Sequence, residues 1–289
     1  MLLLLGMLII LAIYYYKDNQ FKQGSYHKLT HNTYISTLFN IGRNGEYQIY
    51  KLLRNHENMN GKFLFNCYLP KENSETTEID VILINTNGIY VFESKNYSGW
   101  IFGDEKGKYW TQTLPQGRGR SHKEHFFNPI MQNEIHIKWL HSLIGEGNPI
   151  YSIIVFSERC TLKKITITSQ DIQVINRYMI ESAVKHAGSR QSKKLSPEEI
   201  DEIYNILYPF TQINEEQKIQ HINNIKMNHS TPELNNKVNV GMVTGLNKSE
   251  IQICPRCGAT LILRTAKKGI NAGQQFYGCS NYPKCRYIR

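Results

Sequence analysis

The chain has 289 residues, a length that suits one or two domains. Hydrophobic residues make up 40% of it and aromatic residues 11%, values that exclude a disordered, collagen-like or coiled-coil protein and are ordinary for a chain with a buried core. The 34 lysines and arginines exceed the 24 aspartates and glutamates, and the formal net charge of +10 points to a polyanionic partner, either nucleic acid or an anionic membrane surface.

The first segment, residues 1–16, is apolar and uncharged and ends in three tyrosines. As a helix it would be about 24 Å long, short of the roughly 30 Å hydrocarbon core, but bilayers thin around short spans and tyrosines favour the membrane interface. We therefore expect a single-pass transmembrane anchor in the lipid bilayer. Lys17, Lys22 and Lys28 follow it and place the soluble domains in the cytoplasm. A cleaved signal peptide and a buried helix are the alternatives.

An amphipathic helix is predicted over residues 40–54, with Glu46 on the same face as Ile49, Tyr50 and Leu53. A carboxylate on a buried face is costly unless it is paired or bound to a metal ion. Alternatively, Glu46 lies at the edge of the apolar stripe, in a first helical turn whose dipole favours negative charge.

Several segments rich in β-branched and aromatic residues follow, separated by turn residues, and are predicted to be strands. They are Lys62–Tyr68, Ile79–Ile84, Gly88–Glu93, Trp100–Gly103 and Lys108–Thr113. Between the second and third, Asn85-Thr86-Asn87-Gly88 predicts a hairpin turn. A two-residue loop sets Asp80 opposite Glu93 or Lys95, and side chains that are opposed or two positions apart share a face of the sheet. We expect these three side chains to converge.

Two carboxylates and a lysine on apolar strands predict a particular chemistry. Carboxylates brought close together repel unless a cation lies between them, and their oxygens suit Mg²⁺ or Mn²⁺. An ammonium group beside such an ion can orient a water molecule and offset charge on a phosphoryl group. The alternative is an aspartate–lysine pair that closes the end of the sheet.

A glycine-rich basic segment, residues 115–125, follows the strands and is predicted to be a flexible loop. It is either solvated or in contact with nucleic-acid phosphates through Arg118, Arg120 and Lys123. Asn128-Pro129 then predicts the start of a helix whose apolar face carries Gln132.

A set of motifs in this region resembles one family as a whole. They are Gly42-x-x-Gly45-Glu46, Thr77-Glu78-Ile79-Asp80, Gly88-Ile89-Tyr90-Val91-Phe92-Glu93-Ser94-Lys95-Asn96, Ser98-Gly99-Trp100-Ile101-Phe102-Gly103, and Asn128-Pro129 with Gln132. In this order, from about Thr37 to Ser157, they resemble the nuclease-related domain (NERD) family, which is assigned to the PD-(D/E)xK nuclease superfamily. Ser94 stands where that family usually has valine or cysteine.

The resemblance implies an α/β fold of the restriction-endonuclease type, in which helices flank a mixed sheet. It implies that Asp80 and Glu93 bind a divalent metal ion and that Lys95 assists the attacking water molecule. By position, Glu46 matches the helix glutamate of the family and Gln132 matches its later helix glutamine.

After a buried strand at Pro149–Ser157, the chain is predicted to form a short strand at Ile172–Ile175 and helices that begin at Ser196 and cover Asn214–Met227. Residues 229–250 are polar and aperiodic and indicate a linker. Cys67 and Cys160 are isolated and are expected to be buried.

The last 39 residues carry seven of the ten excess positive charges and four of the six cysteines. Cys254, Cys257, Cys279 and Cys285 have the spacing C-x2-C, 21 residues, C-x5-C, which predicts one structural Zn²⁺ ion. The segment resembles the C-terminal zinc fingers of bacterial type IA topoisomerases, which bind single-stranded DNA. Aromatic residues alternate with cations, a pattern typical of nucleic-acid binding. The residues expected to make these contacts are Arg264, Lys267, Lys268, Phe276, Tyr277, Tyr282, Lys284 and Arg286. The alternative is that this zinc-binding segment contacts another protein instead of nucleic acid.

The predicted organisation has six parts. These are an anchor (1–16), a juxtamembrane segment (17–36), a nuclease-like domain (37–170), a helical extension (171–228), a linker (229–250) and a zinc finger (251–289). The predicted function is a membrane-anchored, Mg²⁺- or Mn²⁺-dependent nuclease that hydrolyses DNA, including single strands. The alternatives are a catalytically inactive, membrane-associated DNA-binding protein and an RNA-processing enzyme.

Overall fold

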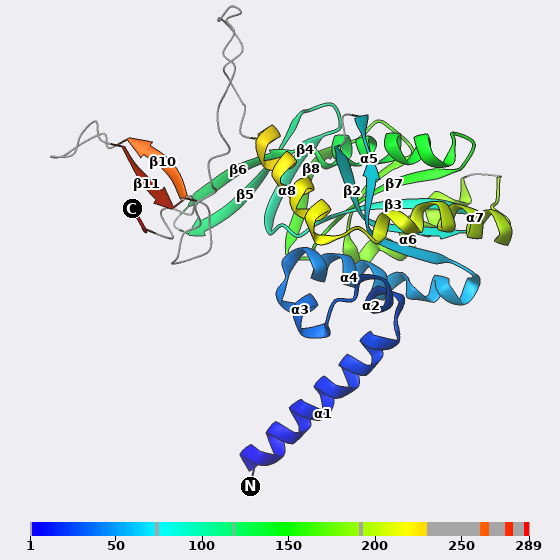
Figure 1. The fold of residues 1–289 in the computed structure, drawn as a ribbon, viewed down its shortest axis with the longest axis horizontal. Coiled ribbons are helices and arrows are strands. Elements are labelled where there is room, and N and C mark those ends of the chain that lie inside the picture. Colours follow the sequence, from blue (N-terminus) through cyan, green and yellow to red (C-terminus); the bar gives the residue numbers. More distant parts are fainter. Residues whose placement is uncertain are drawn as a thin grey trace, which may run out of the picture. The chain divides into compact units, whose positions relative to one another are not determined.

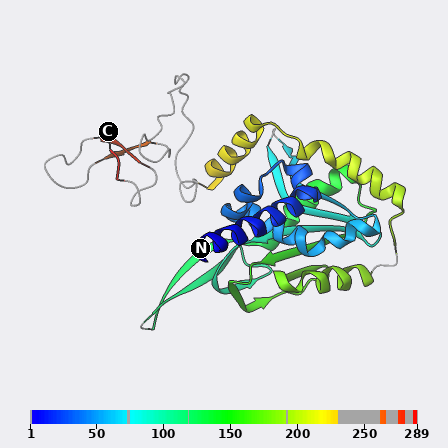
Figure 2. The ribbon, with the colours of Figure 1, turned by 90° about the horizontal axis from the view of Figure 1, so that it is seen from below.

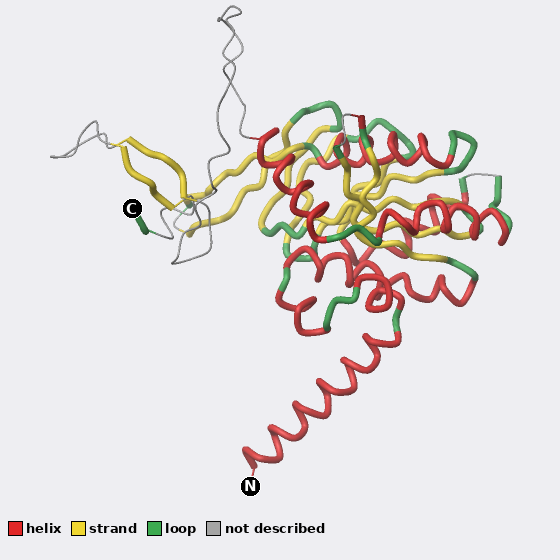
Figure 3. Tube along the Cα trace, in the orientation of Figure 1, coloured by secondary structure: helices red, strands yellow, loops and turns green. Residues whose placement is uncertain are grey.

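The computed structural model describes residues 2–72, 75–117, 119–190, 193–229, 261–265, 275–279 and 286–288. The chain divides into two compact units, residues 1–231 and 232–289. Figure 1 labels the elements along the chain, and Figure 3 separates helices from strands.

The N-terminal part of the first unit is helical. It contains α1 (Leu2–Gln23), α2 (Ser25–Thr30), α3 (Tyr34–Phe39), α4 (Ile41–Leu53) and the 3₁₀ helix η1 (Arg54–Met59). The apolar start of α1 extends away from the sheets, and its side chains from Leu4 to Tyr16 are exposed (Figure 1). Its other end packs through Phe21, whose ring lies edge-on to Tyr47 at 4.9 Å.

The predicted transmembrane span over residues 1–16 is not supported. The helix continues beyond Tyr16 into the polar residues Lys17 and Asp18, so its apolar part is short. Among the residues that the structure describes, no helix combines the length and apolar character needed to cross a membrane. Much of the predicted juxtamembrane segment forms the end of α1 together with α2 and α3.

A five-stranded mixed sheet forms the centre of this unit, in the order β1-β2-β3-β7-β9. Its strands are β1 (Lys62–Pro70), β2 (Thr76–Asn85), β3 (Gly88–Lys95), β7 (Ile150–Phe156) and β9 (Ile172–Asn176). The first three are antiparallel, whereas β3, β7 and β9 are parallel. Their continuous apolar sequences reflect burial on both faces, since alternate side chains enter opposite cores.

Helices cover both faces of this sheet (Figures 1 and 2). One core contains side chains of α4 and of α6 (Ile180–Ser189), and the other contains side chains of α5 (Pro129–Ile144) and α7 (Pro197–Leu207). Two 3₁₀ helices, η3 (Arg177–Met179) and η4 (Tyr208–Thr211), and helix α8 (Glu215–His229) complete the unit. The predicted α/β arrangement of a mixed sheet flanked by helices is thus confirmed.

The β2–β3 hairpin has the two-residue turn that its sequence predicts. Asn85 pairs with Gly88, and the ladder continues to the pair Val81 and Phe92, so the next positions are Asp80 and Glu93. Gly88 has a φ of +135°, and an added Cβ there would lie 2.6 Å from the Pro149 carbonyl oxygen, which explains the glycine. Of the two registers that the sequence left open, this one sets Asp80 opposite Glu93.

A second, four-stranded sheet lies beside the first in the same unit, in the order β6-β5-β4-β8. It contains β4 (Gly99–Asp104), β5 (Tyr109–Gly117), β6 (Arg120–Phe127) and β8 (Cys160–Thr166). The basic segment predicted to be a loop is instead the tip of the β5–β6 hairpin, paired through Gly117 and Arg120. Strand β6 is exposed along most of its length, so its polar sequence lacks the alternation that indicates a half-buried strand.

The second unit contains a hairpin of β10 (Leu261–Thr265) and β11 (Gln275–Cys279), in which Leu261 pairs with Cys279. Cys254, Cys257 and Cys285 lie outside the described residues, as does nearly all of the predicted linker. Cys67 and Cys160 are buried, as expected.

Candidate active site

An ion pair at the end of β3 forms the centre of the candidate site. Lys95 and Glu93 are two positions apart and share a face of the strand, and Lys95 Nζ lies 2.7 Å from Glu93 Oε1. Lys95 Nζ also donates a hydrogen bond to Gln132 Oε1 of α5 at 2.9 Å. Glu93 is 2% exposed. Three of the five predicted catalytic residues therefore lie in direct contact.

His136 completes this group and was not anticipated from the sequence. Its Nε2 lies 3.1 Å from Glu93 Oε2, and its Nδ1 lies 2.6 Å from Thr77 Oγ1 of β2. His136 is four residues after Gln132, on the same face of α5. That spacing is the signal that could have identified it.

Glu93 and Lys95 each stabilise the charged form of the other. Burial raises the pKa of Glu93, but the Lys95 ammonium and the hydrogen bond to His136 outweigh burial, so the pKa is lowered. Burial lowers the pKa of Lys95, but Glu93 and Asp80 outweigh it, so that pKa is raised. Glu93 is therefore an anion and Lys95 a cation at neutral pH.

Asp80 lies on the neighbouring strand β2. Its Oδ2 accepts a hydrogen bond from the backbone N–H of Ser94 at 2.8 Å. Its pKa is raised well above the usual value, first by burial and then by the negative charges of Glu93, Glu46 and Glu78. Ser94 acts here through its backbone, which any residue at this position supplies.

Glu46 reaches the same region from α4. It is 7% exposed, and its Oε2 accepts hydrogen bonds from the Tyr26 hydroxyl at 3.1 Å and from Asn66 Nδ2 at 3.3 Å. Burial, followed by the charge of Glu78, raises its pKa to about 7. Since Glu46 is buried and lies beyond the first turn of α4, the alternative that placed it at an edge near the helix start is wrong.

Glu78 and Asn66 extend this acidic group, and both were missed as site residues. Glu78 Oε1 lies 3.5 Å from Asn66 Nδ2, and Glu78 Oε2 lies 3.7 Å from His221 Nε2 of α8. Asn66 has a φ of +49°, and the β1–β2 pairing skips it opposite Asp80. Glu78 is two positions before Asp80 on one strand, so alternation could have indicated it; Asn66 gives no such signal.

The donor set fits a magnesium ion held by few protein ligands. Among the described residues, no three histidine, cysteine, aspartate or glutamate side chains come together as a metal-binding group. Mg²⁺ commonly takes only one or two carboxylates and completes its shell with water and substrate phosphate. Asp80 and Glu93 supply two, and the pKa of Asp80 is raised first by burial and then by neighbouring anions, whose charge a bound cation would offset.

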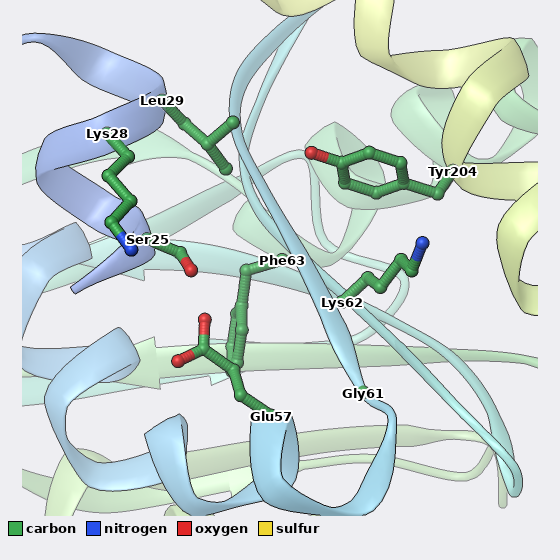
Figure 4. A pocket seen from close by; sticks show the side chains of 8 residues that line it. All are labelled: Ser25, Lys28, Leu29, Glu57, Gly61, Lys62, Phe63 and Tyr204. Carbon is green, nitrogen blue, oxygen red and sulfur yellow. The ribbon is translucent and has the colours of Figure 1, made fainter. Parts of the chain in front are cut away.

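A cavity of about 500 Å³ is lined by Glu46, whereas Asp80, Glu93, Lys95 and Gln132 are not among its lining residues. Asn66 and Glu78 also line it, together with the cations Arg43 and Lys218. A separate cavity of about 430 Å³ is shown in Figure 4 and contains none of the predicted catalytic residues. Of these two cavities, the first is therefore the one that borders the candidate site, through Glu46.

The predicted nucleic-acid contacts fall into two groups. Arg120 and Lys123 are exposed on β6. In the second unit, Arg264, Phe276, Tyr277 and Arg286 are described. The remaining predicted contacts lie outside the described residues: Arg118, Lys267, Lys268, Tyr282 and Lys284.

Two domain families match the chain. Residues 41–157 match the nuclease-related domain, and residues 251–289 match the topoisomerase DNA binding C4 zinc finger. The second match supports a structural Zn²⁺ ion held by the four cysteines predicted from their spacing.

The chain is also similar to individual proteins. A DNA topoisomerase 1 of Methanocaldococcus jannaschii is 62% identical over 40 residues, 14% of this chain and 5% of the relative. An uncharacterized protein of Escherichia coli is 50% identical over 36 residues, 12% of this chain and 17% of the relative. No solved structure matches the chain.

A third similarity extends over more of the chain. An uncharacterized protein of Bacillus anthracis is 31% identical over 166 residues, which are 57% of this chain and 74% of that protein. The nuclease-related match contains Glu46, Asp80, Glu93, Lys95 and Gln132, the residues whose geometry is described above. The chain therefore belongs to the nuclease-related domain (NERD) family.

Proposed function

We propose that the protein is a divalent-metal-dependent nuclease of the restriction-endonuclease type, which hydrolyses DNA phosphodiester bonds and binds DNA through its zinc finger. The buried Lys95–Glu93 ion pair carries this proposal, because it lies on the strand next to Asp80 and α5 holds it in place. The alternative was an aspartate–lysine pair that only closes the end of the sheet. Such a pair would not require Gln132 and His136 as further partners.

Asp80 and Glu93 would hold the Mg²⁺ or Mn²⁺ ion. When bound, the ion supplies an activated water molecule and neutralises charge on the phosphate. Each carboxylate has oxygen lone pairs to spare beyond its protein hydrogen bonds, since an ionised carboxylate offers about four acceptor sites.

Lys95 would orient the attacking water molecule or offset developing negative charge. Glu93 and Gln132 use two of its three N–H donors and fix the ammonium group, and the third has no partner among the described residues. Glu46 would accept hydrogen bonds from metal-bound water, and Gln132 would position Lys95. A preorganised charge of this kind stabilises a transition state without further reorganisation.

The second unit supports DNA as the partner. The matching zinc finger is described as DNA binding, the Tyr277 side chain is exposed, and the cation Arg264 lies opposite Phe276 in the same hairpin. Aromatic rings stack on unpaired bases and cations attract phosphates, so we propose that single strands are included.

We also propose that the protein lies at a membrane with its folded units in the cytoplasm. The exposed apolar side chains of α1 from Leu4 to Tyr16, and the lysines that follow them, support this location. Flotation of the full chain with lipid vesicles is the measurement.

The decisive experiment compares cleavage and binding in one set of variants. Asp80→Asn and Lys95→Ala are expected to lower Mg²⁺-dependent cleavage of supercoiled, linear and single-stranded DNA by roughly 100-fold or more, because each removes a preorganised charge. DNA binding is expected to persist. Asp171→Asn and Lys185→Ala, which change exposed residues elsewhere in the first unit, are the matched controls.

The competing function is a DNA-binding protein without catalysis. If the wild type cleaves no DNA with Mg²⁺ or Mn²⁺, and Asp80→Asn binds DNA and metal as the wild type does, the nuclease proposal is wrong and this function replaces it.

A further inference from the structure

The second sheet has one buried and one open face, and the open face carries aromatic side chains. Ile101 and Trp110 point into the core with Ile130 and Phe156. Side chains one position away point to the opposite face. Trp100 and Tyr109, the neighbours of these buried residues, are 41% and 58% exposed.

The strand register places further residues on this face. Trp100 is opposite Thr161 on β8 and Thr113 on β5, and Thr113, which is itself buried, is opposite the exposed Lys123 on β6. Opposed residues point to the same face. By the same register, the face also holds Phe102, Thr111, His125 and Lys164. We name it the aromatic face, defined by Trp100, Phe102, Tyr109, Thr111, Lys123 and Lys164.

Lysines accompany both exposed rings. Lys163 Nζ lies over the Trp100 ring, 5.5 Å from its centroid, and Lys108 Nζ lies over the Tyr109 ring at 5.4 Å. Together with Lys123 and Lys164, four cations border the aromatic face. The register and alternation place one carboxylate there, that of Asp104, among the described residues of the sheet.

We propose that the aromatic face is a binding platform for single-stranded DNA, separate from the candidate active site and from the zinc finger. Exposed rings stack on bases, and lysines attract the phosphates between them. In a duplex the base faces are covered by their neighbours, so rings on an open sheet can stack only on unpaired bases. The choice of DNA over RNA rests on the function proposed above.

The spacing of the rings suits a strand rather than a mononucleotide. Tyr109 is four residues along β5 from Thr113, the partner of Trp100, which corresponds to roughly 14 Å. The two rings therefore take separate bases.

Tryptophan fluorescence of the full-length protein tests this platform directly. The chain has three tryptophans, of which Trp110 is fully buried. Titration with a 20-nucleotide oligo(dT) is expected to quench the wild type, and Trp100→Phe is expected to lose most of that quenching. Binding by the zinc finger cannot mimic this signal, because all three tryptophans lie in the first unit.

Affinity provides the second measurement. Trp100→Ala combined with Tyr109→Ala is expected to raise the Kd for oligo(dT) at least fivefold, the lower end of the effect of losing base stacking. Tyr178→Ala, which removes another exposed aromatic side chain of the same unit, is the matched control and is expected to bind as the wild type does. Circular dichroism checks that each variant is folded.

The outcomes separate this inference from the nuclease proposal. Equal quenching in the wild type and in Trp100→Phe, or an unchanged Kd in the double variant, overturns the platform even if DNA is cleaved. Quenching that depends on Trp100 supports it even if no DNA is cleaved. Quenching of Trp100 by poly-glutamate but not by oligo(dT) would indicate an acidic protein partner and would also overturn the proposal.

Discussion

At the scale of single residues, the carboxylates of the site differ in what stabilises their charge. Glu93 lies between Lys95 and His136, which favour its ionised form. Glu46 is buried, Asp80 and Glu78 are partly buried, and each of the three has a raised pKa. The site thus contains one carboxylate, Glu93, whose ionised form is stabilised, and three that a bound cation or a proton would stabilise. A divalent metal ion would supply that positive charge.

The free-energy cost of keeping the buried Glu46 carboxylate ionised can be measured as a change in folding stability with pH. Its folded-state pKa of about 7 exceeds the usual 4.5, so protonation stabilises the folded protein. The stabilisation is complete below about pH 4.5 and is lost as the pH rises through 7. In EDTA, Glu46→Gln is therefore expected to be more stable than the wild type by about 3 kcal/mol at pH 8 and nearly equal to it at about pH 4.

Urea unfolding at several pH values measures this difference. Glu146→Gln replaces an exposed glutamate and serves as the control, with no expected change in the pH profile. A Glu46→Gln profile parallel to that of the wild type would contradict the assigned environment of Glu46.

At the scale of elements, α5 connects the two sheets. It begins at Asn128, whose Oδ1 accepts a hydrogen bond from the backbone N–H of Ile130 at 2.9 Å. The Nδ2 of the same side chain donates to the carbonyl oxygens of Asp104, Glu105 and Gly107, between β4 and β5. Because α5 carries Gln132 and His136, this one side chain sets the start of the helix that holds Lys95 and Glu93.

Asn128→Ala is expected to destabilise the protein by roughly 2–4 kcal/mol, because it removes a helix cap and also leaves buried carbonyl groups without their donor. Ser196→Ala is the matched comparison, since Ser196 caps α7 through Glu199 without such further contacts to a turn. It is expected to cost about 1 kcal/mol. Chemical denaturation measures both, and equal losses would show that the carbonyl contacts contribute little.

The elements that the sequence predicts well are those with local signals. The β2–β3 hairpin follows from its turn and apolar runs, and the start of α5 follows from Asn128-Pro129. Most of β5 is predicted as a strand at Lys108–Thr113, but residues 115–125, which contain most of β6, are predicted to be a loop because exposure along β6 removes the periodic pattern. At the site, Tyr26 and Asn66 meet Glu46 only through the tertiary fold, so no spacing in the chain indicates them.

At the scale of the whole molecule, the chain has two units with different sources of stability. The first has its own large cores on both faces of a sheet. The second is short, its described core consists of Leu261 and Cys279 with Tyr287 packed against them, and it matches a C4 zinc finger. A module of this size commonly depends on its metal ion to fold.

Cys279→Ser is therefore expected to abolish binding of one zinc ion per chain and to leave the thermal unfolding of the first unit unchanged. Zinc content and tryptophan fluorescence measure the two effects separately, since every tryptophan lies in residues 1–231. Arg286→Ser, which changes a charge beside a predicted ligand, is expected to retain zinc. A lower unfolding temperature in Cys279→Ser would show that the units stabilise each other.

The two-residue turn of the β2–β3 hairpin also affects the order of folding. It joins Asp80, Glu93 and Lys95 through contacts that are short in sequence, and hairpins of this kind close within about 1–10 μs. Pairing of β3 with β7 must instead close a loop of more than 50 residues, which costs more chain entropy. The lysine therefore reaches its carboxylates early, as part of the same hairpin, and limits their repulsion before α5 brings Gln132 and His136 into place.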